Sequence, residues 1–201
     1  MGEVTQITGL TVALPIDGLD TDQIIPARFM SRSRDDGYGN QLFYDLRRDG
    51  PGNLLPDFPL NASEADDANI LLAGRNFGNG SSREAAVYAL LDGGFRAVVA
   101  PSFGDIFLGN AVNNGLVPAR VSEDVVDTLL HLARQAPLHL SIDLEVGRLA
   151  APGLATTFSL DATSRHKLCN GWDDIDMSLA QIDTIRSFAR QYETTWPWTT
   201  L

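Results

Sequence analysis

Two short apolar runs on either side of a helix-favouring stretch constrain the fold of this chain more than any other feature. The runs NILLA at 69–73 and RAVVA at 96–100 have the length and apolar character of strands that are buried on both faces. The stretch 82–92 between them is rich in alanine and leucine and favours a helix. A strand, helix, strand unit of this kind places two parallel strands in one sheet. The chain is therefore predicted to be an α/β protein.

Further strands are expected on both sides of this unit. TVALP at 11–15 and LVPARV at 116–121 are expected to be strands, and 138–146 alternates apolar and polar residues as a half-buried antiparallel strand does. That strand is expected to pair with RLAAP and TTFSL, which follow it. We therefore expect a single layered β/β/α domain over 1–201, in which a parallel sheet carries additional antiparallel strands.

Two helices and one long excursion are expected within this domain. One helix covers SFGDIFLGNAVNNG and ends near Asn114, and another runs from the N-cap residue Ser122 to about Gln135. The polar segment at about 30–60 is interrupted only by the aromatic patch QLFYDL, which predicts a long loop excursion with one short helix.

The last helix is predicted to start at Ser178. Gln181 follows three residues later, which is the spacing of a capping box. The apolar residues beyond it recur at helical spacing and are expected to face the core. The residues expected to be buried are Ile182, Ile185, Ala189 and Tyr192.

Charge and cysteine content exclude several classes of protein. The formal net charge is −11 and the single lysine is Lys167, so no basic stripe is available and nucleic acid is not expected as a partner. Cys169 is the only cysteine, which excludes an intramolecular disulfide and an iron–sulfur cluster held by this chain alone. The N-terminus lacks a signal-peptide pattern, and no segment reaches about 18 uninterrupted apolar residues. We expect a cytoplasmic protein without a membrane span.

The turn GNGSSRE at 78–84 is the strongest candidate for a functional site. It lies between a predicted strand and a predicted helix, where free backbone N–H groups and the helix dipole favour an anion. Either Ser81 or Ser82 simply caps the helix, or one of them is a base or nucleophile while Arg83 binds a carboxylate. The turn is no dinucleotide fingerprint, because Arg83 stands where the third glycine belongs, and no phosphate-binding loop, because no lysine follows.

A helix N-terminus alone cannot make a serine basic. It contributes roughly 0.3–1 kcal/mol to an exposed anion, whereas one pKa unit corresponds to about 1.36 kcal/mol. The dipole therefore shifts the pKa of a serine hydroxyl by less than one unit. Further cationic groups in a dry site are needed, and we expect another protein to complete the site.

Four segments together resemble a known family. These are DTDQIIPARF (20–29), NFGNGSSREAA (76–86), VVAPSFGDIFLGNAVNNGLVP (98–118) and WDDIDMSLAQID (172–183). They resemble, in the same order over most of the chain, the small subunit of 3-isopropylmalate dehydratase, the swivelling domain of the aconitase superfamily. The resemblance implies a lyase of leucine biosynthesis built from two proteins, in which the large subunit holds a [4Fe–4S] cluster and this chain binds no cofactor.

The resemblance also implies roles for the residues of the turn. Ser81 is implied to be the base that removes a proton from the carbon next to a carboxylate. Arg83 is implied to bind a carboxylate of the small dicarboxylate substrate, while Ser82 and the Gly80 backbone shape the turn. The iron of the partner would take the leaving hydroxyl as a Lewis acid.

The segment DTD is implied to lie near the active-site face, with Asp20 and Thr21 as candidate substrate-binding residues. Asp20 either orients an arginine or a loop, or it only caps the turn that contains it, and the sequence leaves both open. His131, His139 and His166 lie outside every motif and are expected to be ordinary surface or boundary residues.

Two positions depart from the family's usual motif. Asn79 replaces the usual Cys or Glu, and Ala85 replaces the usual His. Activity on 3-isopropylmalate is the leading hypothesis. The alternatives are the same mechanism on citraconate or methylmalate, dimethylmalate or benzylmalate, or a catalytically degraded subunit that only binds and regulates a partner.

Overall fold

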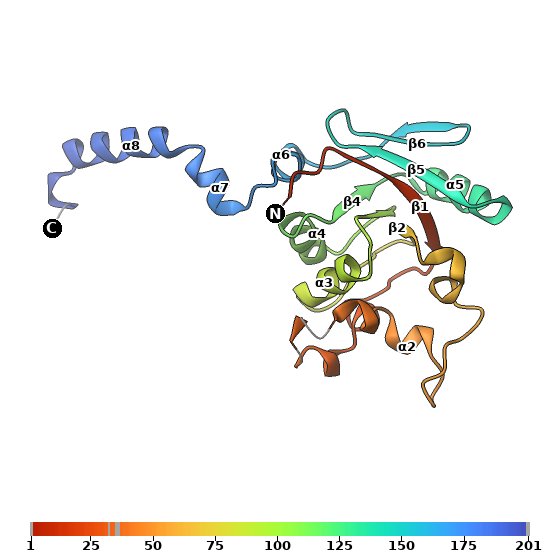
Figure 1. Cartoon of the computed structure of the whole chain (residues 1–201). Helices are drawn as coiled ribbons and strands as arrows, with labels where there is room; N and C mark the ends of the chain where they lie inside the picture. Colours follow the sequence, from red (N-terminus) through yellow and green to blue (C-terminus); the bar gives the residue numbers. More distant parts are fainter. Residues whose placement is uncertain (1, 32, 35–36, 200–201) are drawn as a thin grey trace.

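A seven-stranded mixed sheet organises the chain (Figure 1). The computed structural model describes residues 2–31, 33–34 and 37–199. The spatial order of the strands is β4-β3-β2-β1-β5-β6-β7. The first four strands run parallel to one another, and β5, β6 and β7 continue the sheet in antiparallel pairs. The strands are β1 (Gln6–Leu14), β2 (Ala68–Ala73), β3 (Ala97–Ala100), β4 (Val117–Arg120), β5 (Leu138–Asp143), β6 (Arg148–Ala151) and β7 (Leu154–Thr157).

The expected α/β class, with parallel and additional antiparallel strands, is confirmed, but two strand ends differ. β1 begins at Gln6, before the expected start at Thr11, because its first residues pair with β5. β5 ends at Asp143 rather than at Val146, because the chain turns there toward β6. In this turn the backbone N–H of Val146 donates to the Asp143 carboxylate at 3.2 Å, and Gly147 has a φ of 66°.

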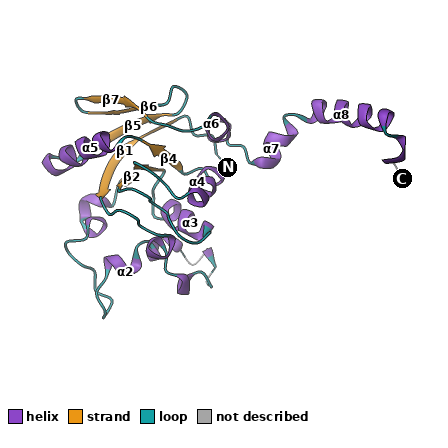
Figure 2. Cartoon of the chain, turned by 180° about the vertical axis from the view of Figure 1, so that it is seen from behind, coloured by secondary structure: helices purple, strands orange, loops and turns teal. Residues whose placement is uncertain are grey.

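Helices cover both faces of the sheet (Figure 2). Alternate residues of β2 belong to different cores: Leu71 lies in the core that contains residues of α3, whereas Ile70 lies in the core that contains residues of α5. This two-sided burial explains why NILLA is continuously apolar. The α-helices are α1 (Thr21–Ile24), α2 (Tyr44–Arg47), α3 (Glu84–Asp92), α4 (Asp105–Asn113), α5 (Glu123–Gln135), α6 (Ala162–Asn170), α7 (Asp174–Leu179) and α8 (Ile182–Thr195). The 3₁₀ helices are η1 (Ala27–Phe29), η3 (Tyr38–Gln41), η4 (Pro59–Asn61), η5 (Ser63–Ala65) and η6 (Pro197–Thr199).

The excursion between β1 and β2 is packed against the body of the domain. It contains the expected short helix, α2, together with 3₁₀ turns. Tyr38, Leu42 and Phe43 are buried in the same core as α3. The backbone N–H of Phe43 also donates to the carbonyl of Ile24 at 2.8 Å, so the aromatic patch anchors the excursion beside α1.

The prediction for the last helix is wrong in its start and its burial. Ser178 belongs to α7, and the capping box joins Asp173 to Asp176 at the start of that helix. α8 begins at Ile182 and has no buried residue. The helical spacing of its apolar residues is as expected, but within the described chain α8 packs extensively only with η6 and not with the core of the domain. The residues wrongly expected to be buried are Ile182, which is half-buried, and Ile185, Ala189 and Tyr192, which are exposed.

Candidate active site

Two turns that are far apart in the sequence are joined at the carboxyl ends of β1 and β2. The backbone N–H of Gly78 donates to the carbonyl of Leu19 at 2.8 Å, and that of Thr21 donates to the carbonyl of Asn79 at 2.9 Å. The Asn79 side chain also accepts from the N–H of Gly80 at 2.8 Å. The segment DTD and the glycine turn therefore form one unit, at the sheet edge where α/β proteins bind their ligands.

Glycine is required in this turn for two different reasons. Gly78 has a φ of 72°, and a Cβ there would lie 2.2 Å from Cγ of Phe107 on α4. Gly80 has a φ of 97° and ordinary space around it, with Cβ of Asp20 at 3.4 Å, so its requirement is conformational. Gly78 thus lets α4 pack directly under the turn, and Gly80 directs the chain outward to the serines.

Both serine side chains are exposed to solvent. The interpretation that one of them caps the helix is wrong: α3 begins at Glu84, its N-cap residue is Arg83, and no side chain caps it. The backbone carbonyl of Ser81 accepts a hydrogen bond from the Thr21 hydroxyl at 2.9 Å, which holds the serine segment against α1. Among residues 2–31, 33–34 and 37–199, no hydrogen bond engages the Ser81 or Ser82 hydroxyl. These hydroxyls are free to meet a ligand.

Arg83 forms an ion pair with Asp22, which the sequence interpretation did not single out. The Arg83 side chain is only 17% exposed, whereas that of Asp22 is 51% exposed. Asp20 instead caps α1, because its carboxylate accepts from the N–H of Gln23 at 2.7 Å. Asp20 therefore has the capping role, and Asp22 is the acid of the DTD segment that contacts Arg83.

Acidic side chains surround the helix N-termini near the turn. Glu84 lies in the first turn of α3 and Asp105 in the first turn of α4. Glu84 accepts from the side-chain amide of Asn114 at 2.7 Å. Burial, and then the charge of Glu84, raise the pKa of Tyr88 one helical turn further on. These carboxylates offset part of the helix dipoles, so Arg83 is the cation of the turn that can bind an anion.

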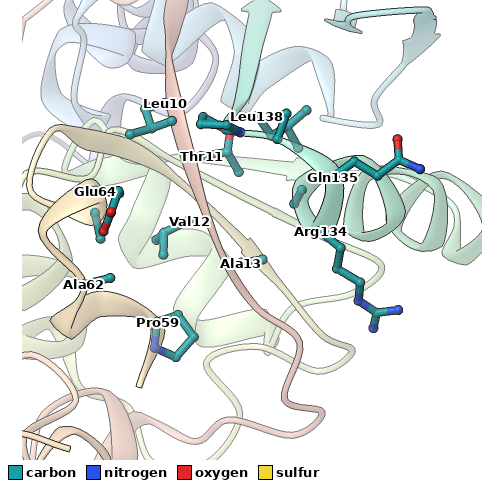
Figure 3. A pocket seen from close by; sticks show the side chains of 14 residues that line it. Leu10, Thr11, Val12, Ala13, Pro59, Ala62, Glu64, Arg134, Gln135 and Leu138 are labelled. Carbon is teal, nitrogen blue, oxygen red and sulfur yellow. The ribbon is translucent and has the colours of Figure 1, made fainter. Parts of the chain in front are cut away.

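The cavity in Figure 3 lies elsewhere on the domain. It has a volume of about 410 Å³ and is formed by residues 10–13 of β1, residues 133–138 at the end of α5, and residues of η4 and η5. None of the predicted site residues lines it. The candidate site is instead an open surface, on which Ser81 and Ser82 lie uncovered.

The described residues form no group of three His, Cys, Asp or Glu side chains that could hold a metal ion. Cys169 is partly exposed, and burial raises the pKa of its thiol.

Within the described residues, no helix is both long and apolar enough to cross a bilayer. His131 contacts Gln135, and the ring of His166 packs on Trp172, so neither histidine belongs to the site.

Comparisons with known proteins agree with the motifs. The family model of the aconitase C-terminal domain matches residues 1–124, which is more than half of the chain. The 3-isopropylmalate dehydratase small subunit of Dinoroseobacter shibae is 42% identical over 98% of this chain and 100% of its own length. That of Rhodospirillum centenum is 44% identical over 98% of each chain.

A solved structure is similar as well. The crystal structure of 3-isopropylmalate dehydratase from Methanocaldococcus jannaschii matches with a TM-score of 0.63 and 28% identity, over 92% of this chain and 99% of that chain. The resemblance stated from the four sequence segments is thereby confirmed. This chain belongs to the family of 3-isopropylmalate dehydratase small subunits, which carry the C-terminal domain of the aconitases.

Proposed function

We propose that this chain is the small subunit of a two-subunit hydro-lyase that interconverts 2- and 3-isopropylmalate in the cytoplasm during leucine biosynthesis. The observation that carries the proposal is an exposed Ser81 with a free hydroxyl, two residues before a half-buried arginine. The relatives that bear this enzyme's name align over nearly the whole chain.

In this proposal Arg83 binds a carboxylate of the substrate. A guanidinium has five N–H donors in a planar fork, so the contact with Asp22 leaves donors available for a carboxylate. Binding places the carbon next to that carboxylate beside the turn, where Ser81 can reach its proton. Ser82 and the Gly80 backbone complete the wall of the site, and Asp20 caps α1 beside them. Thr21, expected to bind substrate, is only 2% exposed, so it supports the turn from behind through its hydrogen bond to the Ser81 carbonyl.

Ser81 acts as the base in the dehydration step. In the completed site its oxygen is an alkoxide that takes the proton from the carbon next to the carboxylate. The electron pair of that C–H bond forms the alkene, and the hydroxyl leaves the neighbouring carbon as hydroxide with the electron pair of the C–O bond. The proton on Ser81 and the hydroxide are together the elements of water. Rehydration of the alkene diacid with the opposite regiochemistry returns both and moves the hydroxyl by one carbon.

A partner protein is required because this turn cannot activate a serine by itself. The helix N-terminus supplies less than one pKa unit, and nearby carboxylates weaken that contribution. A [4Fe–4S] cluster needs several thiolates, so in this proposal the large subunit holds it. When bound there, the cluster would supply a Lewis acid for the leaving hydroxyl.

The test is turnover by the reconstituted pair of subunits. This chain alone is expected to be inactive, and addition of a cluster-loaded large subunit should produce turnover of 3-isopropylmalate. Ser81→Ala should lower kcat by roughly 10²–10⁴-fold, the range of general acid–base catalysis, while leaving complex formation intact. Ser63→Ala, in η5 and outside the site, is the matched control.

Different outcomes would point to the alternatives. Unchanged turnover by Ser81→Ala would reject the assignment of the base. Turnover only with citraconate or methylmalate, dimethylmalate or benzylmalate would change the substrate and keep the mechanism. A saturable complex without alkene product from any malate would identify a regulatory subunit, in which Asn79 and Ala85 mark the loss of activity.

A further inference from the structure

The C-terminal part of the chain extends away from the domain (Figures 1 and 2). We call residues 173–198 the C-terminal arm, which comprises α7, α8 and most of η6. α8 has 14 residues and, within the described chain, packs extensively only with η6. Isolated helices of about this length are marginal in water, so a helix here needs a surface that covers it.

One side of the arm is an uncovered apolar stripe. Ile185, Phe188 and Tyr192 follow the spacing i, i+3, i+7 and lie on the same side of α8. Phe188 is 65% exposed and Tyr192 is 44% exposed, and their ring centroids lie 5.8 Å apart. The arm carries further exposed apolar residues outside α8, namely Ile175, Leu179 and Trp198.

The base of the arm is firmly attached to the domain. Lys167 of α6 is buried, and its ammonium group contacts the carbonyl oxygen of the Asn113 side chain at 3.0 Å and the carboxylate of Asp174. Asp173 caps α7 through the N–H groups of Ile175 and Asp176, each at 2.8 Å. The arm therefore leaves the domain from a defined point, and the residues of its apolar stripe are exposed.

We propose that the C-terminal arm lays this stripe into an apolar groove of the large subunit and anchors the two subunits to each other. The inference rests on the proposed function, since that function supplies the partner. Amphipathic helices commonly bind in this way, with anchors at i, i+3 and i+7. Aromatic side chains bury roughly 150–250 Å² each, and Phe188, Tyr192 and Trp198 are 65%, 44% and 69% exposed. Docking would therefore bury roughly half of that area for each ring, and together with the aliphatic residues of the arm this is a substantial part of the ~800 Å² per partner of a standard interface.

Charge argues against a second copy of this chain as the occupant. Each copy carries a formal charge of −11 at pH 7, and a net charge far from zero keeps proteins monomeric. Within the arm, acidic residues outnumber basic ones, because five carboxylates accompany only Arg186 and Arg190. Two such arms would repel each other, whereas a groove with basic residues at its rim would attract one.

The apolar stripe of α8 is separate from the active site. The base of the arm contacts Asn113 at the end of α4, and the next residue, Asn114, contacts Glu84 beside Arg83. The stripe lies beyond this point, on α8, which packs extensively only with η6 within the described chain. The arm can therefore hold the subunits together without touching the reacting groups, so loss of the stripe should weaken binding and leave the chemistry unchanged.

The test compares full-length variants in titrations against purified, cluster-loaded large subunit. Phe188→Ala combined with Tyr192→Ala should raise the Kd for the large subunit at least 100-fold, because aromatic anchors dominate such interfaces. Ser187→Ala combined with Thr194→Ala changes the opposite side of the same helix and should stay within 2-fold of the unmodified chain. At saturating large subunit, the aromatic variant should recover the unmodified kcat, which Ser81→Ala cannot do.

Each result separates this inference from the proposed function. If the unmodified chain binds and the aromatic variant binds equally well, the arm is not the anchor, and the proposed function stands. If the free chain sediments as a dimer that the aromatic variant dissociates, a second copy occupies the stripe and the inference is overturned. If the unmodified chain does not bind a large subunit, the proposed function fails and this inference fails with it.

Discussion

Arg83 and Asp22 show how the site is prepared at the level of single residues. The guanidinium is mostly covered by protein, and the carboxylate beside it is half exposed. If Arg83 binds a substrate carboxylate as proposed, Asp22 orients the arginine before substrate arrives and competes with the substrate for the same N–H donors. Asp22 is therefore proposed as a positioning residue that acts through Arg83.

Replacement of Asp22 tests this role in the reconstituted enzyme. Asp22→Asn should change the KM for the malate substrate by up to about 5-fold, the effect of an exposed ion pair, with little change in kcat. Steady-state kinetics separate the two constants. Asp45→Asn, which removes the carboxylate paired with Arg28 away from the site, should change neither constant. An unchanged KM for Asp22→Asn would contradict the positioning role.

The sequence indicated most of the residues that the structure brings together at the candidate site, but not all the contacts between them. Ser81 and Arg83 were recognisable because the motif that contains them is contiguous. Asp22 was missed because the choice between the two acids of DTD depends on how α1 turns. Asp20 occupies its N-cap, which leaves Asp22 to project toward Arg83.

At the level of elements, the packing of α4 under the glycine turn determines the geometry of the site. The Phe107 ring on α4 occupies the space that a side chain at position 78 would need. It also packs edge-on against the ring of Phe77, with the two ring centroids 5.3 Å apart. The turn is therefore held from below by aromatic contacts, while its backbone is held from the side by α1.

A pair of glycine replacements separates packing from backbone strain. Gly78→Ala places an alanine in the left-handed backbone conformation and creates a clash with Phe107. It should lower the free energy of unfolding by about 2–4 kcal/mol. Gly18 has a similar φ of 69°, but no atom lies within 4 Å of a Cβ added there. Gly18→Ala should therefore lower the free energy of unfolding by only about 1 kcal/mol. Urea denaturation measures both values. Equal losses in the two variants would show that the α4 contact contributes nothing.

The whole molecule consists of a packed domain and an arm that the domain does not cover. α5 and α8 have similar lengths and similarly placed apolar stripes, yet α5 buries Val126 and Leu129 whereas α8 buries nothing. Their sequences alone do not reveal this difference. It arises because β5 and β1 lie beside α5, and no such sheet lies beside α8.

Hydrogen exchange should therefore distinguish the two helices in the isolated chain. Amides of α5 are expected to be protected to near the global free energy of unfolding, since opening them uncovers the core. Amides of α8 are expected to exchange at least 100-fold faster, because a 14-residue helix without packing is marginally stable. Mass spectrometry after timed deuteration measures both segments. Equal protection in the isolated chain would show that α8 is covered by another copy.

The sequence by itself determined the alternation of strands and helices, the two-sided burial of β2 and the place of the glycine and serine turn between β2 and α3. These features depend on residues close together in the chain, where hydrophobic spacing and turn-forming residues act locally. Only the tertiary structure decided which acid pairs with Arg83, that neither serine caps α3, and that the last helix stays uncovered. Those outcomes depend on which surfaces meet across long sequence separations, and the apolar stripe of α8 has the same pattern whether its own core or a partner covers it.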